Sequence, residues 1–330
     1  FFCNFFRFFI IEEIIENKAE DGGIQQVYFV ACGGSLGAFF SANHFMQSEA
    51  KKLKAAAINS NEFVHDTPAA MGVNSVVILC SHAGNTPETV KAAELAHNKG
   101  AAVIGMTYTP GSPLTEFCDY VVGYKFRTDL EMNFSEDKAL VPLTIAVEIL
   151  NQVEGFEAYD KYQDGLNKID GIIRNAQKQV EQRALDFAQT YKDDKIIYTM
   201  GSGAGYGAAY IQSICIFMEM QWINSSSIHT GEYFHGPFEI TDLNTPFLIQ
   251  MNEGRTRALD ERALDFLKKY AKRYEVVDAK ELGLSTIEAP VVDYFNQTLF
   301  TCVYDIYNFA LADARKHPLS TRRYMWKVEY

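Results

Sequence analysis

The segment that decides the fold is Gln25–Ala31 (QQVYFVA), which runs into Cys32–Gly37 (CGGSLG) and then into AFFSANHFMQ. Its apolar run predicts a buried strand, and the glycines that follow predict a tight turn into a helix. The same order recurs at Lys195–Gly201 (KIIYTMG), Ser202–Gly207 (SGAGYG) and AAYIQSICIFMEMQW. The chain therefore contains a strand, a glycine turn and a helix twice.

The repeat continues beyond this unit. VVILCSHAGNTPETVKAAELAHNKGAAVIGMTY in the first half matches PFLIQMNEGRTRALDERALDFLKKYAKRYEVVDA in the second, and both predict strand, turn, helix and strand. Gly33 and Gly84 lie 51 positions apart, as do Gly203 and Gly254. Strands that alternate with helices predict parallel sheets with helices on both faces. We therefore predict an α/β protein with two doubly wound parallel-sheet lobes, related by duplication and joined by helices.

The predicted domain organisation has four parts. Residues 1–23 form an N-terminal helical segment, 24–150 the first lobe, 151–192 a helical connection, and 193–330 the second lobe with a docked C-terminal tail. The N-terminal apolar run is interrupted by Asn4 and Arg7, so it is too short and too charged for a membrane span. We expect it to pack on the body or on a partner subunit.

Composition narrows the class of protein. The 330 residues carry a net charge of −12, which disfavours binding to nucleic acid or to an anionic membrane surface. The six cysteines are scattered, with no CxxC pair and no spacing typical of a metal site. We expect reduced thiols, a cytoplasmic protein, and neither a metal nor a cofactor.

A phosphate site is predicted in the first lobe. Ser81–Thr89 (SHAGNTPET) follows a strand and opens a helix, where free N–H groups and the helix dipole favour anions. A local alternative is an ordinary helix start, with Thr86 as the cap and Pro87 in the first turn. The preceding glycine turn brings Ser35 to the same crevice. The predicted phosphate-binding residues are Gly34, Ser35, Ser81, His82, Asn85 and Thr86.

The equivalent loop of the second lobe, Asn252–Thr256, carries the carboxylate of Glu253, so we expect no phosphate there. Gly203–Ala208 also fits the loose GxGxxA pattern of dinucleotide-binding turns, a weak signal by itself. A nicotinamide-dependent enzyme is an alternative on that basis.

Two residues of the second lobe are candidates for acid/base chemistry. Glu219 lies within the apolar helix segment ICIFMEMQW, where burial would raise its pKa towards the range of a general base. The alternative is a glutamate that faces solvent at the helix end. His235, flanked by Phe234 and Gly236, is either a turn histidine or a proton shuttle.

The sequence resembles the sugar isomerase (SIS) superfamily over residues ~24–330. The segments that carry the resemblance are CGGS, SHAGNT, the Glu219 helix, EYFHGP and the lysine near the C-terminus. They are similar to the isomerase half of glucosamine 6-phosphate synthase. The resemblance implies that Ser35, Ser81 and Thr86 bind a sugar phosphate. It also implies that Glu219 moves a proton between C1 and C2, that His235 of a neighbouring subunit opens the ring, and that Lys327 is the C-terminal lysine. A homodimer with shared active sites follows.

The sequence departs from that synthase at Ala83, which replaces a hydroxyl in the phosphate loop, and we expect no glutaminase domain before the lobes. It more closely resembles the fructosamine 6-phosphate deglycases over YKDDKIIYT, GAGYGAAY, QSICIFMEMQW, GEYFHGPFEITD and RRYMWKVEY. The resemblance implies cleavage of a phosphorylated sugar–amino acid conjugate to glucose 6-phosphate and an amino acid, and it favours 6-phosphofructose-aspartate. Alternatives are a fructoselysine 6-phosphate deglycase, an aldose–ketose isomerase and a non-catalytic sugar-phosphate sensor. Candidates for binding the side chain of an acidic amino acid are Arg255, Arg257, Arg322 and Arg323. The alternative is that these arginines are solvated surface residues.

Overall fold

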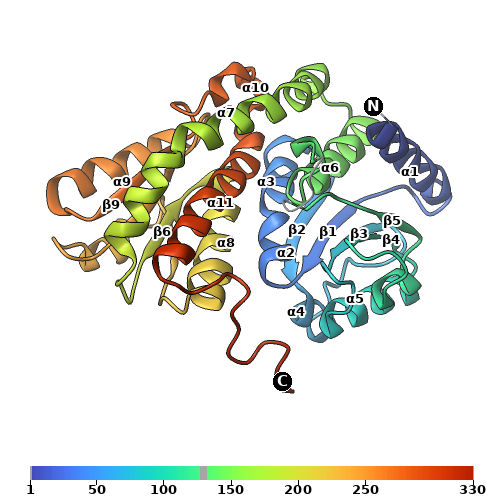
Figure 1. Ribbon diagram of the computed structural model, residues 1–330. Coiled ribbons are helices and arrows are strands. Elements are labelled where there is room, and N and C mark those ends of the chain that lie inside the picture. Colours follow the sequence, from blue (N-terminus) through green and yellow to red (C-terminus); the bar gives the residue numbers. More distant parts are fainter. Residues whose placement is uncertain (1, 127–131, 330) are drawn as a thin grey trace. The chain divides into compact units, whose positions relative to one another are not determined.

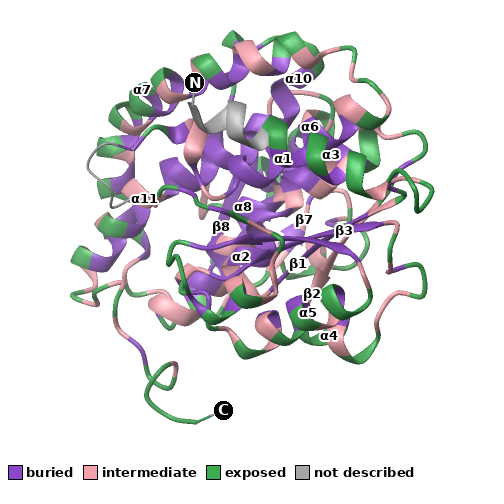
Figure 2. Cartoon of the chain, turned by 90° about the vertical axis from the view of Figure 1, so that its right-hand side faces the viewer, coloured by how far each residue is buried: buried purple, intermediate pink, exposed green. Residues whose placement is uncertain are grey.

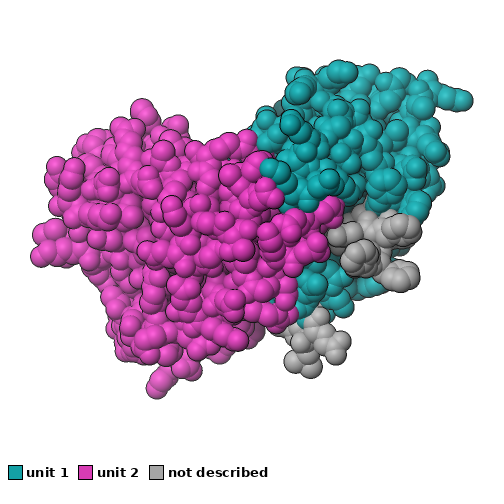
Figure 3. Space-filling model, turned by 90° about the horizontal axis from the view of Figure 1, so that it is seen from above, with its two compact units in different colours: residues 1–162 teal, residues 163–330 magenta. Residues whose placement is uncertain are grey.

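The computed structural model describes residues 2–126 and 132–329 of the chain. The chain divides into two compact units, residues 1–162 and 163–330, which Figure 1 shows as ribbons and Figure 3 in separate colours. Each unit has its own sheet and its own core, so each is described by itself.

The first unit is built on a parallel sheet of five strands in the order β2-β1-β3-β4-β5. The strands are β1 (Gln26–Ala31), β2 (Lys54–Asn59), β3 (Ser75–Cys80), β4 (Ala102–Met106) and β5 (Tyr120–Val122). All of β3 is buried, as expected for a central strand covered on both faces by helices. Each fully buried valine, isoleucine or leucine contributes about 1.5–3 kcal/mol relative to an exposed one.

The helices of this unit are α1 (Phe2–Lys18), α2 (Gly33–Ala38), α3 (Phe40–Glu49), α4 (Ser60–His65), α5 (Pro87–Asn98) and α6 (Leu140–Val153), with the 3₁₀ turns η1 (Pro113–Phe117) and η2 (Phe134–Glu136). Helix α1 packs on α6, and Ile10, Ile11 and Ile14 are buried. The N-terminal segment therefore packs on its own unit.

The second unit has a parallel sheet of four strands in the order β7-β6-β8-β9. The strands are β6 (Tyr198–Gly201), β7 (Ser227–His229), β8 (Phe247–Met251) and β9 (Tyr274–Asp278). Helix α7 (Tyr159–Tyr191) leads into this unit, which also contains α8 (Tyr206–Ile211), α9 (Arg257–Tyr270), α10 (Ala289–Val292) and α11 (Asn296–Ala314). The shorter turns are η3 (Gly203–Gly205), η5 (Pro237–Ile240), η6 (Leu284–Thr286) and η7 (Asp293–Phe295), and η4 (Gln212–Met220) is a π-helix.

The two sheets share one topology. In each, the chain passes from the first strand to an edge strand on one side and then returns to pair on the other side of the first strand. The reversal falls between β1 and β3 in the first unit and between β6 and β8 in the second. The predicted fold, two duplicated α/β lobes with parallel sheets, is confirmed. Figure 2 shows the strands buried beneath helices whose outer faces are exposed.

Two further features follow from the side chains. No helix in the described parts of the chain is long and apolar enough to cross a membrane. The described cysteine side chains, Cys32, Cys80, Cys118, Cys215 and Cys302, form no disulfide.

Candidate active site

The predicted phosphate residues lie at the reversal point of the first sheet. Ala31 of β1 pairs in register with Cys80 of β3, so the loops that follow these two strands start side by side. Gly34 and Ser35 lie in the first turn of α2, directly after β1, and Ser81, His82, Asn85 and Thr86 lie in the loop after β3. The crevice at the carboxyl ends of strands where the order reverses is where open α/β sheets bind ligands.

Thr86 occupies the cap position of α5, but its side chain makes no capping hydrogen bond. Its hydroxyl lies 2.9 Å from Ser81 Oγ. The backbone N–H groups of Ala83 and Asn85 have no acceptor among the described residues. The loop therefore offers hydroxyls and free N–H groups to an anion, which fits the phosphate prediction better than the ordinary helix start.

The ring of His82 takes part in an aromatic cluster. It is stacked on Tyr108 at 5.0 Å and lies 4.6 Å from Phe126, both measured between ring centroids. His82 Nδ1 is 3.0 Å from the hydroxyl of Tyr124, and burial raises the pKa of Tyr124. Tyr124 is thereby held neutral, and the cluster fixes one side of the loop.

Sequence reasoning missed Lys138, which lies just before α6. Lys138 Nζ donates a 2.8 Å hydrogen bond to the hydroxyl of Ser35 and is 5.6 Å from the centroid of the Tyr124 ring. Lys138 follows no recognisable motif and is 103 positions from Ser35, so only the folded chain brings the two together.

The equivalent loop of the second unit is filled by its own side chains. The N–H groups of Glu253 and Arg255 donate to Asn296 Oδ1 at 2.8 Å and to Asp293 Oδ1 at 2.7 Å. These N–H groups correspond to those of Ala83 and Asn85 in the first unit. The expectation that this loop binds no phosphate thus gains a physical reason beyond Glu253, because a buried carboxylate already occupies it.

The glycines of the second unit's turn have a packing role. A Cβ at Gly205 would collide with the side chain of Asn252, and Gln250 Nε2 donates to Gly205 O at 2.6 Å. Close packing of the unit's own side chains therefore accounts for the glycine pattern that resembled a dinucleotide turn.

Glu219 lies on the π-helix η4, near its C-terminal end. Single π turns are rare and are frequent at functional sites. The helix ends at Met220, and Trp222, two residues later, has a φ of 55°, a left-handed conformation that costs a non-glycine residue about 1–2 kcal/mol. Such strain is typical of functional sites, because the surrounding structure must hold it in place.

The carboxylate of Glu219 is partly buried and is paired with an arginine. Its Oε1 lies 2.8 Å from Arg322 Nη2, and the side chains of Glu219 and Arg322 are 22% and 8% exposed. Burial raises the pKa of Glu219, and the charge and hydrogen bond of Arg322 oppose this rise without cancelling it. Glu219 does not face open solvent, and its electrostatics suit a general base.

The segment after α11 is tied to the end of η4 at several points. Gln221 Nε2 donates to His317 O at 2.8 Å, and the His317 ring is 4.7 Å from that of Trp222. Together with the pair of Glu219 and Arg322, these contacts dock the start of the tail. Beyond Arg322 the side chains are largely exposed: Tyr324, Trp326 and Val328 are 64%, 77% and 52% exposed.

The other predicted catalytic residues are not in contact with Glu219. Lys327 Nζ donates to the backbone oxygen of Arg322 at 2.6 Å. His235 is exposed in the turn before η5, and its side chain has no hydrogen-bond partner in the described part of the chain. One subunit thus brings Lys327 near the Glu219–Arg322 pair, while His235 stays free.

The four arginines considered for an acidic leaving group differ in their environments. Arg257 is paired with Asp278, Arg255 with Asp293, and Arg322 with Glu219. Arg323 has no carboxylate partner among the described residues and lies 4.2 Å from the centre of the Trp222 ring.

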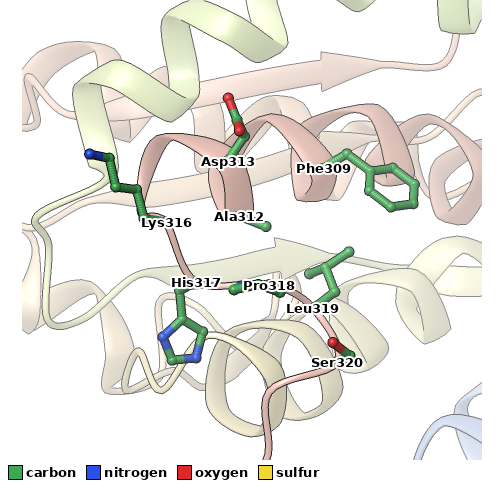
Figure 4. A pocket seen from close by; sticks show the side chains of 8 residues that line it. All are labelled: Phe309, Ala312, Asp313, Lys316, His317, Pro318, Leu319 and Ser320. Atoms are coloured by element: carbon green, nitrogen blue, oxygen red, sulfur yellow. The ribbon is translucent and has the colours of Figure 1, made fainter.

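A cavity of about 750 Å³ lies at the C-terminal end of α11 and is lined by Phe309, Asp313 and His317 among others (Figure 4). None of the predicted phosphate or catalytic residues lines it. The chemistry predicted from the sequence is therefore not located in this cavity.

The chain is similar to known proteins in sequence and in fold. The SIS domain family matches residues 24–129. The chain is 44% identical to the fructosamine deglycase FrlB of Bacillus subtilis (strain 168), over 93% of each protein. It is 26% identical to the fructoselysine 6-phosphate deglycase of Escherichia coli (strain K12), over 93% of this chain and 88% of that protein. A phosphosugar isomerase candidate from Salmonella typhimurium LT2 has a structure with a TM-score of 0.94 and 49% identity, covering 98% of this chain and 97% of that one.

The two parallel-sheet lobes and the family match define the class, that of the SIS-domain proteins. The similarity to FrlB extends over both lobes, and the chain belongs to the fructosamine deglycase family. The predicted resemblance and the predicted enzyme class are thereby confirmed.

Proposed function

We propose that this enzyme cleaves fructosamine 6-phosphates, with 6-phosphofructose-aspartate as the preferred substrate, into glucose 6-phosphate and a free amino acid. The observation that carries the proposal is the environment of Glu219 in a chain that belongs to the deglycase family. A carboxylate whose pKa is raised by burial, yet which stays paired with Arg322, can accept a proton from carbon near neutral pH.

The reaction needs one base, one acid and no redox step. Glu219 removes a proton from C1 of the open-chain substrate, and the electron pair of the C–H bond forms the C1–C2 double bond. The electrons of the C2 carbonyl move to its oxygen, which takes a proton from an acid, His235 or water, and becomes a hydroxyl. Return of the proton to C2 gives an imine at C1. Water adds to C1, the C–N bond breaks with the electrons on nitrogen, and the products are the aldehyde sugar phosphate and the amino acid.

Phosphate recognition is remote from these bonds. Ser35, Ser81 and Thr86 hold the phosphate with the free N–H groups of the loop after β3, and Gly34, His82 and Asn85 complete the two loops. Binding energy from a group that does not react holds the reacting carbons in place. Phosphorylated substrates should therefore exceed their unphosphorylated forms in kcat/KM.

The experiment is an endpoint assay of glucose 6-phosphate and free amino acid after incubation with the 6-phosphates of fructose-aspartate and fructose-lysine. Glu219→Gln should lower kcat by about 100-fold or more, the usual contribution of a general base. The control is Glu181→Gln, which removes the same charge from an exposed position of α7 and should retain wild-type rates.

If the wild-type protein releases glucose 6-phosphate and amino acid from neither conjugate, the proposal is refuted. Interconversion of an aldose and a ketose phosphate without cleavage would favour an isomerase, and sugar-phosphate binding without turnover would favour a sensor. Faster release of lysine than of aspartate would reassign the preferred substrate and keep the reaction.

His235 is proposed to open the sugar ring in the active site of a neighbouring subunit of a cytoplasmic homodimer. Support comes from its exposure and from the lack of any contact with Glu219 within the described chain. Heterodimers of Glu219→Gln and His235→Asn subunits should regain about half of the wild-type dimer's activity, since one of the two composite sites is intact. Isolated heterodimers without activity would contradict a shared site.

Arg323 is proposed to read the second carboxylate of an aspartate leaving group, because the other three arginine candidates are paired with carboxylates of the chain itself. Arg323→Met should raise KM for the aspartate conjugate and leave that for the lysine conjugate unchanged. An equal effect on both would remove Arg323 from this role.

A further inference from the structure

We propose that Lys138 supplies the positive charge that neutralises the substrate phosphate. The proposal rests on the proposed function, since it names the group that binds that substrate's anionic end.

The first argument is position. Lys138 Nζ is 2.8 Å from the hydroxyl of Ser35, in the first turn of α2. The centroid of the Tyr124 ring lies 5.6 Å from Lys138 Nζ. The hydroxyl of Tyr124 is in turn hydrogen-bonded to His82 in the loop after β3. Lys138 therefore lies within the same group of side chains as both predicted phosphate loops.

The second argument is charge balance. Lys138 is partly buried, and no carboxylate of the described residues lies within ion-pair distance of its ammonium group. An ammonium has three N–H donors, and the hydrogen bond to Ser35 uses one of them. Partial burial of an unpaired charge is unfavourable, so a ligand anion would remove a cost that the free protein bears.

The third argument is a comparison of the two units. The segment that precedes the long buried helix carries Asp293 before α11 and Lys138 before α6. In the second unit the carboxylate of Asp293 accepts the N–H of Arg255, whereas in the first the N–H of Asn85 has no acceptor. The second unit thus provides its own anion, Asp293, at this loop. The first unit instead provides a cation, Lys138, near a loop that lacks an anion.

The test compares Lys138→Met and Lys138→Arg with the wild-type enzyme. Affinity for glucose 6-phosphate and for glucose is measured by calorimetry at several salt concentrations, and KM and kcat are measured with the phosphorylated aspartate conjugate. Lys138→Met should weaken glucose 6-phosphate binding at least about tenfold, the low end of what a hydrogen bond to a charged group contributes. Its KM should rise more than its kcat falls, and Lys138→Arg should restore most of the affinity.

The matched control is Lys91→Met, which removes the same charge from an exposed position of α5 and should leave binding unchanged. Thermal unfolding without ligand identifies a structural role, since that role would lower the midpoint of Lys138→Met. If Lys138→Met does not fold, Lys138→Gln takes its place in the same comparison.

Unchanged glucose 6-phosphate affinity in a folded Lys138 variant would overturn the proposal while leaving the deglycase reaction standing. Glucose 6-phosphate binding that depends on Lys138, in an enzyme that releases no amino acid, would support this site and refute the proposed function instead. Wild-type enzyme that does not bind glucose 6-phosphate would overturn the assignment of Lys138.

Discussion

Replacement of Arg322 by methionine should shift the pH dependence of catalysis. Arg322 opposes the rise in the pKa of Glu219 that burial causes, so its removal raises that pKa further. The base is then protonated over a wider range of pH. The acidic limb of the kcat/KM profile should move to higher pH. The loss of kcat/KM relative to the wild-type enzyme should shrink as the pH rises.

The size of the effect follows from the contact. The two charged groups are 2.8 Å apart and mostly shielded from solvent. Hydrogen bonds to charged groups contribute about 1.5–3 kcal/mol, and each 1.4 kcal/mol is a factor of ten. On the acidic limb, Arg322→Met should therefore lose about 10- to 100-fold in kcat/KM.

The thermal stability of Arg322→Met should also be lower than that of the wild-type protein, but with the opposite dependence on pH. Because the pKa of Glu219 is raised on folding, its contribution to stability is present below its ordinary pKa and is lost as the pH rises through the folded value. In Arg322→Met this loss is larger, so the difference in thermal midpoint from the wild-type protein should grow from pH 5 to pH 8.

The assay is a pH profile of kcat/KM, with thermal unfolding over the same range. The control is Arg174→Met, which also breaks an arginine–carboxylate pair, with Asp170 at 2.7 Å, but at a side chain that is 52% exposed. Its profile should match the wild-type one. A uniform loss at every pH in Arg322→Met would refute the reasoning, since it would show that Arg322 acts on substrate binding and not on the ionisation of Glu219.

Two further predictions concern the anion loops. Gly84 has a φ of 68°, and an added Cβ would overlap Ser112, whereas Gly111 has a φ of 73° with open space around it. Because of this overlap, Gly84→Ala should be less stable than Gly111→Ala by about 1–3 kcal/mol. Gly84→Ala should also bind sugar phosphate more weakly. Thermal unfolding and calorimetry measure the two effects, and equal effects in the two variants would contradict the prediction. Asp293→Ala should destabilise the enzyme by about 1–3 kcal/mol because the Arg255 N–H is left unpaired. Inorganic phosphate should raise the unfolding midpoint of that variant more than that of the wild-type protein, and an equal shift would count against an anion-shaped loop.

Much of the candidate site could be predicted because it depends on local sequence. A glycine turn after a buried strand positions Ser35, and the Ser81–Thr86 loop follows from the next strand, since the carboxyl ends of parallel strands share one edge. The apolar neighbours of Glu219 indicated burial, and in the structure its side chain is partly buried, with 22% exposed. The role of His235 could not be decided, because turn residues carry little periodic information.

The pairings of charged side chains could not be predicted. Arg322 and Arg323 are adjacent and chemically identical, yet one is buried against Glu219 and the other lies exposed on Trp222. Lys138 is one of many lysines, and no motif surrounds it. Which of several like charges becomes buried depends on distant segments that meet only when the helices pack.

The sequence by itself determined the two lobes, the parallel sheets and the places where loops gather, because hydrophobic periodicity and turn glycines act over a few residues and occur here twice. Only the tertiary structure decided which loop is open to an anion and which is filled. Asp293, just before α11, accepts the N–H of Arg255 and fills the loop of the second unit, whereas Lys138, just before α6, contacts Ser35 in the first unit. Their side chains act across long sequence separations, and the free energy of such contacts is set by burial and geometry, which the order of residues does not display.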